Sequence, residues 1–422
     1  MTSPTKSWIP YTSDCDFSIH NIPFGIYKTT SGVEHVASAI GDFVIDLAAL
    51  NSLGYFNELR IDQSIFVNKY LNDFIALGKH KTNRVREILI ELFSSTNSSL
   101  AAHQAHKEQV LKAMKDAEML LPVHIPNYTD FYSSIEHATN VGTMFRDPKN
   151  ALLPNWKHIP IGYHGRASSI CVSGTNFHRP KGQTKAADAE LPIFGATKML
   201  DFELEMAFII GKETQLGETI PIERTNEYIF GMVLFNDWSA RDMQTWEYVP
   251  LGPFLAKNFA STISPWVVTM EALAPFRVAQ PVQEPQVLPY LQTTQNNNVD
   301  IHLQVAIQPE KGEEKVVSNS NFKYMYWSMN QQLAHHTSNG CNMQIGDMYA
   351  SGTISGPTPD SYGSMLELSW RGTKPIAMPD GSERKFILDN DTVIMRGYCS
   401  KDGMRVGFGE VKAKVLPQLN IF

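Results

Sequence analysis

The feature that most constrains this chain is an alternating acidic segment, Asp201-Phe-Glu-Leu-Glu-Met-Ala-Phe-Ile-Ile210. Its first half alternates polar and apolar residues, which is the periodicity of a β-strand. Asp201, Glu203 and Glu205 therefore point to one face of the predicted strand, and the apolar residues between them point to the other. The second half has no polar face, which indicates that the strand runs into the interior of the protein.

A second acidic segment, Leu234-Phe-Asn-Asp-Trp-Ser-Ala-Arg-Asp-Met-Gln244, follows at a distance that suits a return strand. Carboxylates on one face of a strand lie only ~7 Å apart, so they repel unless water or a cation neutralises them. A set of oxygen ligands with no His or Cys at ligand spacing suits Ca²⁺ or Mg²⁺. The alternative is a solvated outer face, but the apolar continuation and the second acidic segment favour a metal site.

The overall balance of residues narrows the class of protein. A formal net charge of −7 and the lack of a Lys/Arg-rich run argue against nucleic-acid binding. The four cysteines form no C-x-x-C pair, which favours a reducing compartment. The sequence shows neither a secretory signal nor an apolar run of ~18 residues, the length that a membrane span needs. We therefore expect a cytoplasmic protein that acts on a small molecule, away from membranes.

The first part of the chain reads as short strands followed by helices. Two apolar runs on either side of Gly41-Asp42 predict a β-hairpin. The spacing of Val85, Ile88, Leu89, Leu92 and Phe93 predicts an amphipathic helix. A further helix is expected to include residues 110, 111 and 114. The proline-bracketed segment 121–126 is the predicted boundary, so residues 1–120 form a small β-plus-α domain.

Residues 121–422 have a different sequence pattern, which predicts short alternating strands, Gly/Pro turns and few long helices. This pattern predicts a large mixed β domain that is rolled or barrel-like, so the fold class is α+β and mostly β. Residues 274–299 contain four prolines and three consecutive asparagines, which predict an exposed excursion between strands. Strict alternation resumes from Ile301 to Ile307 and predicts another strand.

A helix is expected to begin soon after the second acidic strand, with Asp237 or Ser239 as its N-cap. If the helix runs on, Asp237, Arg241, Gln244 and Tyr248 share one of its faces. An acid, a guanidinium, an amide and a phenol that face one cleft would make an oxygen-rich ligand site. The alternative is an ordinary capped helix with an Asp–Arg ion pair.

Two further charged residues lie in apolar surroundings. Lys257 is the single lysine of an apolar, turn-rich segment, where a snorkelling side chain is the common outcome and anion stabilisation is the functional one. Glu367 lies on a predicted apolar strand that follows a turn-rich loop. A buried carboxylate needs a partner, and a histidine would provide one. The alternative for Glu367 is the solvent face of an edge strand.

The segment from Asn127 to Ala138 offers more candidates. Asp130 could add an oxygen ligand, and His137 could act as a general base because its unperturbed pKa of ~6.5 lies near neutral pH. A structural role is the more common fate of a single histidine. Tyr163 lies in a glycine-rich loop whose spacing does not match a nucleotide-binding loop. Arg146 is a candidate for binding a carboxylate.

Five ordered motifs in these segments, residues 201–205, 235–242, 250–255, 351–356 and 363–370, resemble the fumarylacetoacetate hydrolase family. The similarity extends over essentially the whole chain. It implies a small SH3-like N-terminal domain, a C-terminal mixed β-roll and a homodimer. It also implies hydrolysis of 4-fumarylacetoacetate to fumarate and acetoacetate, the last step of phenylalanine and tyrosine degradation.

The resemblance also implies a role for each matching residue. Ca²⁺ would be bound by Asp130, Glu203, Glu205 and Asp237, and an Mg²⁺ site would match Asp237, Lys257 and Ser261. His137 and Glu367 would activate water, and Arg241, Gln244 and Lys257 would stabilise developing negative charge. The substrate would be held by Tyr132, Arg146, Tyr163, Gln244, Tyr248 and Thr353.

Two departures from the family pattern concern the implied Mg²⁺ site. Ser261 replaces a threonine, and Ala256 and Ala260 replace glycines. A hydroxyl group remains at position 261. An alanine at a position that needs a positive φ would shift the local loop.

Two other kinds of function fit the same residues. One is another reaction of the family, such as acylpyruvate hydrolysis, β-keto-acid decarboxylation or isomerisation. The other is a calcium-dependent binding module without catalysis, in which Glu367 and Lys257 are structural. The presence of His137 and the long N-terminal region favour hydrolysis of fumarylacetoacetate.

Overall fold

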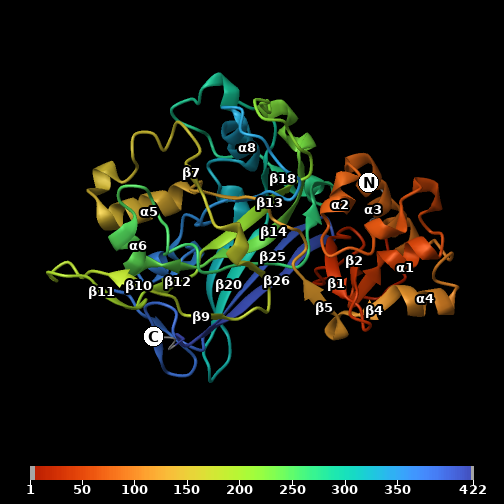
Figure 1. Cartoon of the computed structure of the whole chain (residues 1–422), viewed down its shortest axis with the longest axis horizontal. Helices are drawn as coiled ribbons and strands as arrows, with labels where there is room; N and C mark the ends of the chain where they lie inside the picture. Colours follow the sequence, from red (N-terminus) through yellow and green to blue (C-terminus); the bar gives the residue numbers. More distant parts are fainter. Residues whose placement is uncertain (1–4, 420–422) are drawn as a thin grey trace.

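A five-stranded antiparallel sheet forms the first part of the chain in the computed structural model, which describes residues 5–419 (Figure 1). Its strand order is β4-β3-β2-β1-β5, with bounds β1 Phe24–Lys28, β2 Glu34–Ile40, β3 Phe43–Asp46, β4 Leu111–Ala113 and β5 Glu118–Leu120. Strands β2 and β3 pair with Ile40 opposite Phe43, which confirms the hairpin predicted at Gly41-Asp42.

Four helices accompany this sheet: α1 Leu47–Ser52, α2 Asn72–Ala76, α3 Lys79–Phe93 and α4 Gln104–Val110. The predicted apolar stripe is confirmed in α3, where all five of its residues are buried. The predicted helix through Met114 is wrong beyond Val110. The residues from Leu111 to Ala113 instead pair with Ile45 to Phe43, so the hydrogen bonds of the sheet override the helical spacing.

The second part of the chain is built around an eight-stranded sheet with the order β7-β6-β22-β13-β14-β16-β8, in which β17 pairs with β14. The bounds are β6 Tyr128–Phe131, β7 Gly162–His164, β8 Ile170–Val172, β13 Leu204–Ile210, β14 Ile229–Asp237, β16 Ser261–Ile263, β17 Val268–Thr269 and β22 Met348–Ala350. Strands β13 and β14 are antiparallel neighbours, which confirms the predicted return strand.

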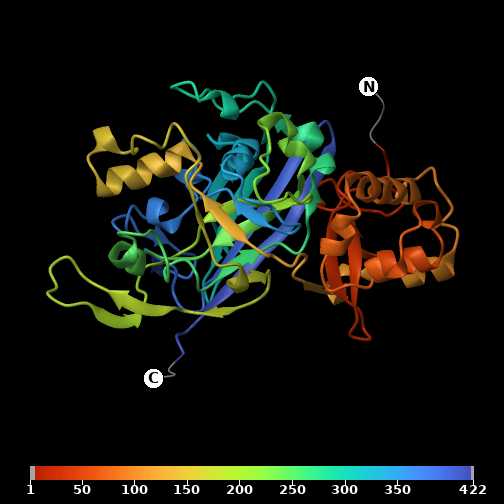
Figure 2. The same ribbon diagram turned by 45° about the horizontal axis from the view of Figure 1, so that its top comes forward.

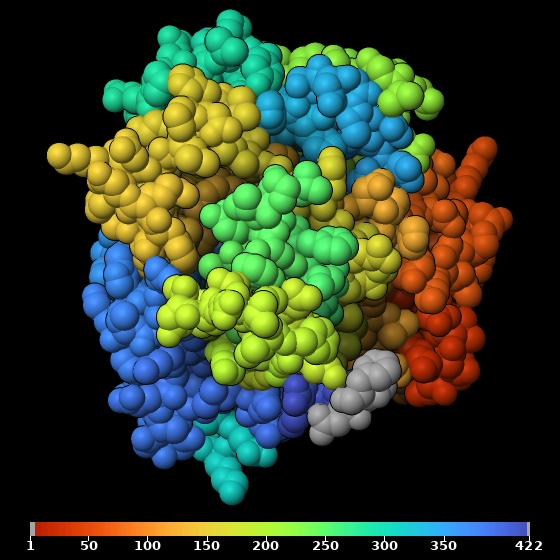
Figure 3. All heavy atoms as spheres, turned by 60° about the vertical axis from the view of Figure 1, so that its left-hand side comes forward, coloured from red at the N-terminus to blue at the C-terminus, as the bar shows by residue number. Residues whose placement is uncertain are grey.

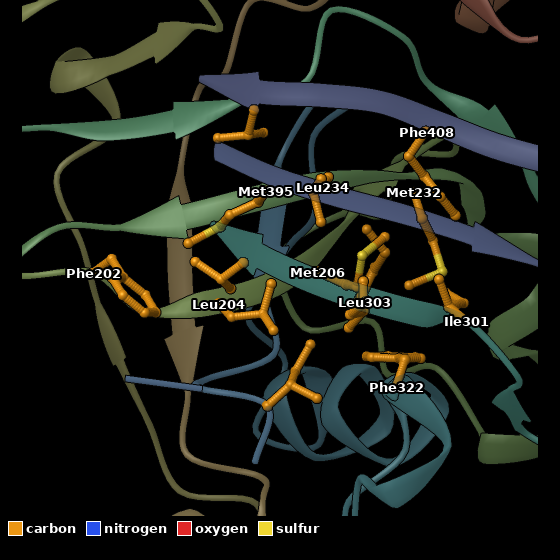
Figure 4. Close-up of a cluster of buried hydrophobic side chains, with 14 of the residues drawn as sticks. Phe202, Leu204, Met206, Met232, Leu234, Ile301, Leu303, Phe322, Met395 and Phe408 are labelled. Atoms are coloured by element: carbon orange, nitrogen blue, oxygen red, sulfur yellow. The ribbon is translucent and has the colours of Figure 1, made fainter. Parts of the chain in front are cut away.

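A five-stranded sheet with the order β21-β20-β25-β26-β9 packs on one face of the eight-stranded sheet (Figure 2). Its bounds are β9 Phe177–His178, β20 His302–Gln308, β21 Lys315–Asn321, β25 Thr392–Lys401 and β26 Met404–Leu416. Figure 4 shows Leu204, Met206 and Leu234 of one sheet facing Leu303, Met395 and Phe408 of the other. The alternation predicted from Ile301 to Ile307 is confirmed by β20.

The opposite face of the eight-stranded sheet packs against the N-terminal part of the chain. Phe230, Val233 and Phe235 of β14 share a buried cluster with Phe24 and Ile26 of β1. On this face, the apolar residues end where the acids begin. Asp237 follows Phe235 with alternating spacing, and the corresponding ends of β13 and β6 carry an acid in the same way. The apolar part of this face therefore anchors the N-terminal part, and its end carries carboxylates.

Short elements complete the second part. The paired strands are β10 Lys181–Thr184 with β11 Ile193–Ala196, β12 Leu200–Asp201 with β15 Ser239–Ala240, β18 Arg277–Val278 with β19 Asn298–Val299, and β23 Ile376–Ala377 with β24 Glu383–Arg384. The helices are α5 Ile135–Phe145, α6 Arg241–Glu247, α7 Met270–Leu273, α8 Met329–Thr337 and α9 Met365–Leu368. The described residues contain more strand than helix, as predicted. Among residues 5–419, no helix has both the length and the apolar character needed to cross a bilayer.

The predicted excursion at residues 274–299 is exposed only in part. Val282 is exposed, but Leu291 and Asn298 are buried. The side chain of Asn298 donates hydrogen bonds to the carbonyl oxygens of Lys323 and Met325, at 3.0 and 2.8 Å. Asparagine therefore anchors the end of the segment, because its amide satisfies backbone groups that are buried there.

Candidate active site

Three buried carboxylates from three strands of the eight-stranded sheet meet at its acidic end. Asp130 of β6, Glu205 of β13 and Asp237 of β14 each have a carboxylate oxygen within 4.8 Å of the other two. One oxygen of Asp130 and one of Glu205 are buried without a hydrogen-bond partner. Unpartnered buried oxygens are costly, and an oxygen-only set is the chemistry that Ca²⁺ and Mg²⁺ prefer. These three residues therefore fit a hard divalent cation, and we call them the acidic triad.

The fourth predicted ligand, Glu203, lies between two cations. Its Oε1 accepts a hydrogen bond from Nη2 of Arg241 at 2.6 Å, and its Oε2 accepts one from Nζ of Lys257. Nζ of Lys257 also donates to Oδ2 of Asp237 at 2.7 Å, and Ser261 donates to the other oxygen of Asp237 at 3.0 Å. Lys257 is buried and does not snorkel, so its charge is balanced by the carboxylates of Glu203 and Asp237.

The charges of the site divide the acids into two groups. Burial, and then the charge of Asp237, raises the pKa of Asp130 well above its usual value. Burial, followed by the charges of Asp130 and Asp237, does the same to the pKa of Glu205. Burial also disfavours ionised Glu203, but the nearby cations outweigh it and lower the pKa of Glu203. Glu203 is therefore ionised, whereas the acidic triad needs a cation to hold its full negative charge.

A histidine–glutamate pair lies beside this cluster. His137, on α5, has Nδ1 2.6 Å from Oε2 of Glu367, and both side chains are buried. Nε2 of His137 lies 4.0 Å from Oε1 of Glu203. Burial disfavours the Glu367 anion, but the charge and hydrogen bond of His137 lower the pKa of Glu367 below its usual value. An ionised Glu367 accepts the proton on Nδ1 and leaves Nε2 free to take a proton from another molecule.

Glu367 is held by neutral donors as well. Asn140 donates to its Oε1 at 2.9 Å, Ser364 donates to Oε2 at 2.8 Å, and the hydroxyl of Ser355 lies 2.9 Å from both oxygens. Sequence reasoning missed these three residues. Two signals could have found some of them: Asn140 lies one turn after His137 on the same helix, and Ser364-x-x-Glu367 is the spacing of a capping box.

Three local predictions about these residues are wrong. Helix α6 begins at Arg241 with Ala240 as its N-cap, and neither Asp237 nor Ser239 caps it. Asp237 belongs to β14, so it does not share a helical face with Arg241, although its carboxylate reaches the same cluster through the sheet. Glu367 lies in the four-residue helix α9 and not on a strand, because Ser364 caps that helix with its hydroxyl.

The predicted substrate-binding residues fall into two groups. Tyr132 packs edge-on against His137 with ring centroids 5.4 Å apart, and Tyr163 is paired with Asp130 across β6 and β7. Thr353 is buried beside Gly352, and Gln244 accepts a hydrogen bond from Nη1 of Arg241 at 3.1 Å. The other group is exposed and consists of Arg146 and Tyr248, the residues that follow α5 and α6.

The two alanines that replace family glycines do not distort the backbone. Neither Ala256 nor Ala260 is among the described non-glycine residues with positive φ. Both side chains are buried, and Ala256 packs with Ala240 and Met243. The loop shift that a positive φ would have caused at these positions is therefore not expected.

Gly352 shapes the site because its N–H donates to Oε2 of Glu205 at 2.9 Å. Its φ is +77°, and a Cβ there would lie 2.2 Å from the carbonyl oxygen of Phe131. We expect Gly352→Ala to lower the free energy of unfolding by about 3 kcal/mol or more, from the strained φ and the clash together. Urea unfolding measures the loss.

Gly174→Ala is the matched control, because Gly174 has a φ of +93° with no atom within 4 Å of the added Cβ. Its free energy of unfolding should fall only by the cost of a left-handed backbone at an alanine, about 1–2 kcal/mol. Equal losses in the two variants would show that the close approach to Phe131 carries no cost.

Comparisons with known proteins show the family to which the chain belongs. The family described as "Fumarylacetoacetate (FAA) hydrolase C-terminal" matches residues 127–416, and "Fumarylacetoacetase N-terminal" matches residues 20–122. The chain is 52% identical over 415 residues to a fumarylacetoacetase of Homo sapiens, covering 98% of this chain and 99% of the relative. It is 52% identical over 418 residues to that of Dictyostelium discoideum and 46% identical over 415 residues to that of Arabidopsis thaliana, each covering 98% of both chains.

A solved structure shares the fold at low sequence identity. The fumarylacetoacetate hydrolase from Exiguobacterium antarcticum superposes with a TM-score of 0.53 at 16% identity, covering 94% of this chain and 100% of that chain. The two matched regions and the relatives that match nearly the whole chain show the family. The chain belongs to the fumarylacetoacetate hydrolase family.

Proposed function

We propose that this chain hydrolyses the C–C bond of 4-fumarylacetoacetate to give fumarate and acetoacetate, the last step of phenylalanine and tyrosine degradation. The observation that carries the proposal is the buried His137–Glu367 pair beside the acidic triad and the Arg241 and Lys257 cations. Relatives of about half-identical sequence over nearly the whole chain bear the name fumarylacetoacetase, which supports the substrate.

The triad of Asp130, Glu205 and Asp237 would hold a divalent cation, Ca²⁺ or Mg²⁺. Glu203 completes a four-carboxylate set only if one of its oxygens turns from Arg241 or Lys257 toward the triad. Ser261 and Lys257 each donate a hydrogen bond to Asp237, where the resemblance implies the Mg²⁺ site. A bound cation would supply Lewis-acid polarisation of the substrate's keto oxygens.

His137 acts as the general base. Glu367 accepts the proton on Nδ1, so the lone pair of Nε2 is free to take a proton from water. The hydroxide attacks the carbonyl carbon next to the double bond and becomes the hydroxyl of a new carboxyl group, which releases its remaining proton to solvent as fumarate forms. The C–C bond then breaks, and its electron pair leaves with acetoacetate, which takes up the proton from His137. The proton balance is closed, and His137 returns to its neutral state.

Arg241, Gln244 and Lys257 stabilise the negative charge that develops during the attack and the cleavage. Burial opposes the charge of Lys257, but the carboxylates of Asp237 and Glu203 raise its pKa above the usual value, so it stays protonated. Burial also opposes the charge of Arg241, but the carboxylates of Glu203 and Asp201 raise its pKa above the usual value. Two fixed cations that need no reorganisation are suited to an anionic transition state.

The substrate is held by residues around this centre. Tyr132, Tyr163, Gln244 and Thr353 lie in or next to the buried cluster, and we assign to them the diketone part of the substrate. Arg146 and Tyr248 lie at the exposed ends of α5 and α6, and we assign to Arg146 the binding of a terminal carboxylate.

The decisive experiment is to incubate the purified protein, with Ca²⁺ or Mg²⁺ added, with 4-fumarylacetoacetate and to follow the loss of the diketone absorbance. Acylpyruvates and β-keto acids serve as competing substrates. Preferential turnover of fumarylacetoacetate is expected. Preference for an acylpyruvate or a β-keto acid would assign another reaction of the family, and cation binding without any turnover would indicate a binding module.

We also propose a homodimer, formed through an exposed apolar surface that we call the dimer patch. It consists of Leu191, Ile193, Phe194, Trp246, Val249, Leu251, Phe254 and Leu255. The two segments that carry it lie together on the face drawn in Figure 3, and Trp246 donates a hydrogen bond to Gln183 of the β10–β11 hairpin. Contiguous apolar patches of this kind mark interaction surfaces, and a second copy is the occupant that we assign.

We expect Leu251→Asp to convert the dimer to a monomer, because Leu251 is 96% exposed in one chain and a charge would be buried in the pair. Light scattering after gel filtration measures the mass. Leu216→Asp is the control, since Leu216 is 83% exposed outside the dimer patch. A Leu251→Asp variant with the mass of two chains would contradict this assignment.

We further propose that residues 1–120 form a domain of the SH3-like type and residues 121–422 a catalytic β-roll. The separate five-stranded sheet of the first part supports the division. Four free thiols among the described residues support a cytoplasmic location. Amide hydrogen exchange tests the division, since the two parts are expected to open as separate units, and cell fractionation tests the location.

A further inference from the structure

Asp201 is a fully buried acid that belongs neither to the acidic triad nor to the His137–Glu367 pair. It ends the short strand β12, two residues before Glu203. Its carboxylate is outside the acidic triad, so a metal ion does not account for it. A buried carboxylate costs several kcal/mol unless it is paired and hydrogen-bonded, so its partners indicate what it is for.

One partner is the guanidinium of Arg241. Nε of Arg241 donates to Oδ2 of Asp201 at 2.7 Å, while Nη2 and Nη1 donate to Glu203 and Gln244. A guanidinium has five N–H donors, so these three contacts fix its plane and leave two N–H groups to face a substrate. Asp201 anchors the end of the guanidinium group nearest the backbone.

The other partner is the segment that carries Glu367. The backbone N–H of Met365 donates to Oδ1 of Asp201 at 2.6 Å, and that of Leu366 donates to Oδ2 at 3.1 Å. These are the first two residues of α9, and Glu367 is the third. One carboxylate therefore holds the position of the helix that carries the partner of His137.

We propose that Asp201 is a positioning residue that fixes Arg241 and Glu367 relative to each other. The proposal rests on the function proposed above. Asp201 touches neither His137 nor the acidic triad through any hydrogen bond in the described structure, so it acts through the two residues that it anchors. The group that stabilises the transition state and the group that orients the base are thereby placed by a single side chain.

The test is a double-mutant cycle in the full-length enzyme with metal added. Asp201→Asn keeps the shape of the side chain but loses the charge that holds Arg241. A displacement of about 1 Å at a reacting group can cost about 100-fold in rate, so we expect kcat to fall by about 10- to 100-fold with little change in KM. In an Arg241→Lys background, the same substitution should lower kcat by a smaller factor than in the wild type, because the link to Arg241 is already lost and only the link to the helix of Glu367 remains.

Asp391→Asn is the matched control. Asp391 is also a buried acid that holds an arginine, with both of its oxygens 2.7 Å from Arg384, and it accepts a backbone N–H from Leu388. It makes no hydrogen bond to a residue of the candidate site. Asp391→Asn should lower the free energy of unfolding and leave kcat within about 2-fold of the wild type. This control separates a displacement of Arg241 and Glu367 from a general loss of stability.

The outcomes distinguish this proposal from the function on which it rests. Wild-type protein that does not cleave fumarylacetoacetate overturns the function. If the wild type cleaves fumarylacetoacetate but Asp201→Asn has an unchanged kcat, the role of Asp201 is overturned. It is also overturned if Asp201→Asn lowers kcat by the same factor in the Arg241→Lys background as in the wild type.

Met365→Pro is the second variant and keeps the test valid if Asp201→Asn does not fold. Proline is tolerated at the first position of a helix, and the preceding Ser364 has the extended backbone that proline requires. The proline ring replaces the N–H that donates to Oδ1 of Asp201 with a methylene group, so it breaks this hydrogen bond and displaces the carboxylate, and the variant also loses a buried side chain. We expect kcat to fall by about 3-fold or more, and an unchanged kcat would overturn the link to Glu367.

Discussion

We expect His137→Ala to lower kcat for fumarylacetoacetate by about 10²- to 10⁴-fold, the range that general acid–base catalysis contributes. The reason is that we assign to Nε2 of His137 the removal of a proton from water, because Glu367 already occupies Nδ1. Bound metal should remain at the wild-type level, because no nitrogen belongs to the acidic triad. Steady-state kinetics and elemental analysis of the purified variant measure the two quantities.

The control for this prediction is His80→Ala, since His80 is exposed on α3 in the N-terminal part of the chain. It should retain wild-type kcat. Glu367→Ala should resemble His137→Ala, because the loss of the carboxylate leaves the imidazole without its orienting partner. A well-folded His137→Ala variant with full turnover would remove His137 from the mechanism.

Glu205→Gln is expected to abolish the stabilisation that a divalent cation gives to the wild-type protein. A cation that binds only the folded state adds about 2.7 kcal/mol at 100 times its Kd. Without metal, the variant should be at least as stable as the wild type. Burial and two neighbouring acids already raise the pKa of Glu205, so a neutral amide relieves repulsion. It can also still accept the N–H of Gly352.

Unfolding in urea, measured with EDTA and then with added Ca²⁺ or Mg²⁺, tests this prediction directly. Asp347→Asn is the matched control because Asp347 is a buried acid that precedes β22 and lies outside the triad, and it should keep the full response to the cation. A Glu205→Gln variant that gains as much stability as the wild type from either cation would place the metal site elsewhere.

The parts of the site that the sequence predicted are those set by strand periodicity. The spacing of Asp201, Glu203 and Glu205 predicted one acidic strand, and the length to Asp237 predicted its return partner. The return strand is confirmed, but the acidic strand is interrupted at residues 202 and 203, between β12 and β13. Both predictions follow from local rules, because the side-chain period of a strand is two and a hairpin-like return needs a limited length of chain. The carboxylates then meet because the register of the sheet places them at the same end of their strands.

The parts that the sequence did not predict depend on contacts between distant segments. Lys257 was ambiguous because only the fold decides whether a lysine reaches buried acids or solvent. The position of Glu367 on a short helix depends on Ser364 and on the carboxylate of Asp201, which lies more than 160 residues earlier. In the same way, residues 111–113 form a strand because β3 offers them unpaired backbone groups, against their helical spacing.

The mixed character of one sheet face has a practical consequence for anyone who wishes to shorten this enzyme. The strands that present the triad at one end also present Phe230, Val233 and Phe235 to the N-terminal part of the chain. A chain without its first 120 residues would expose these rings and branched side chains to water, directly alongside the carboxylates. Such a fragment should aggregate and should not be an active enzyme, because the apolar face of its sheet needs the N-terminal part to cover it.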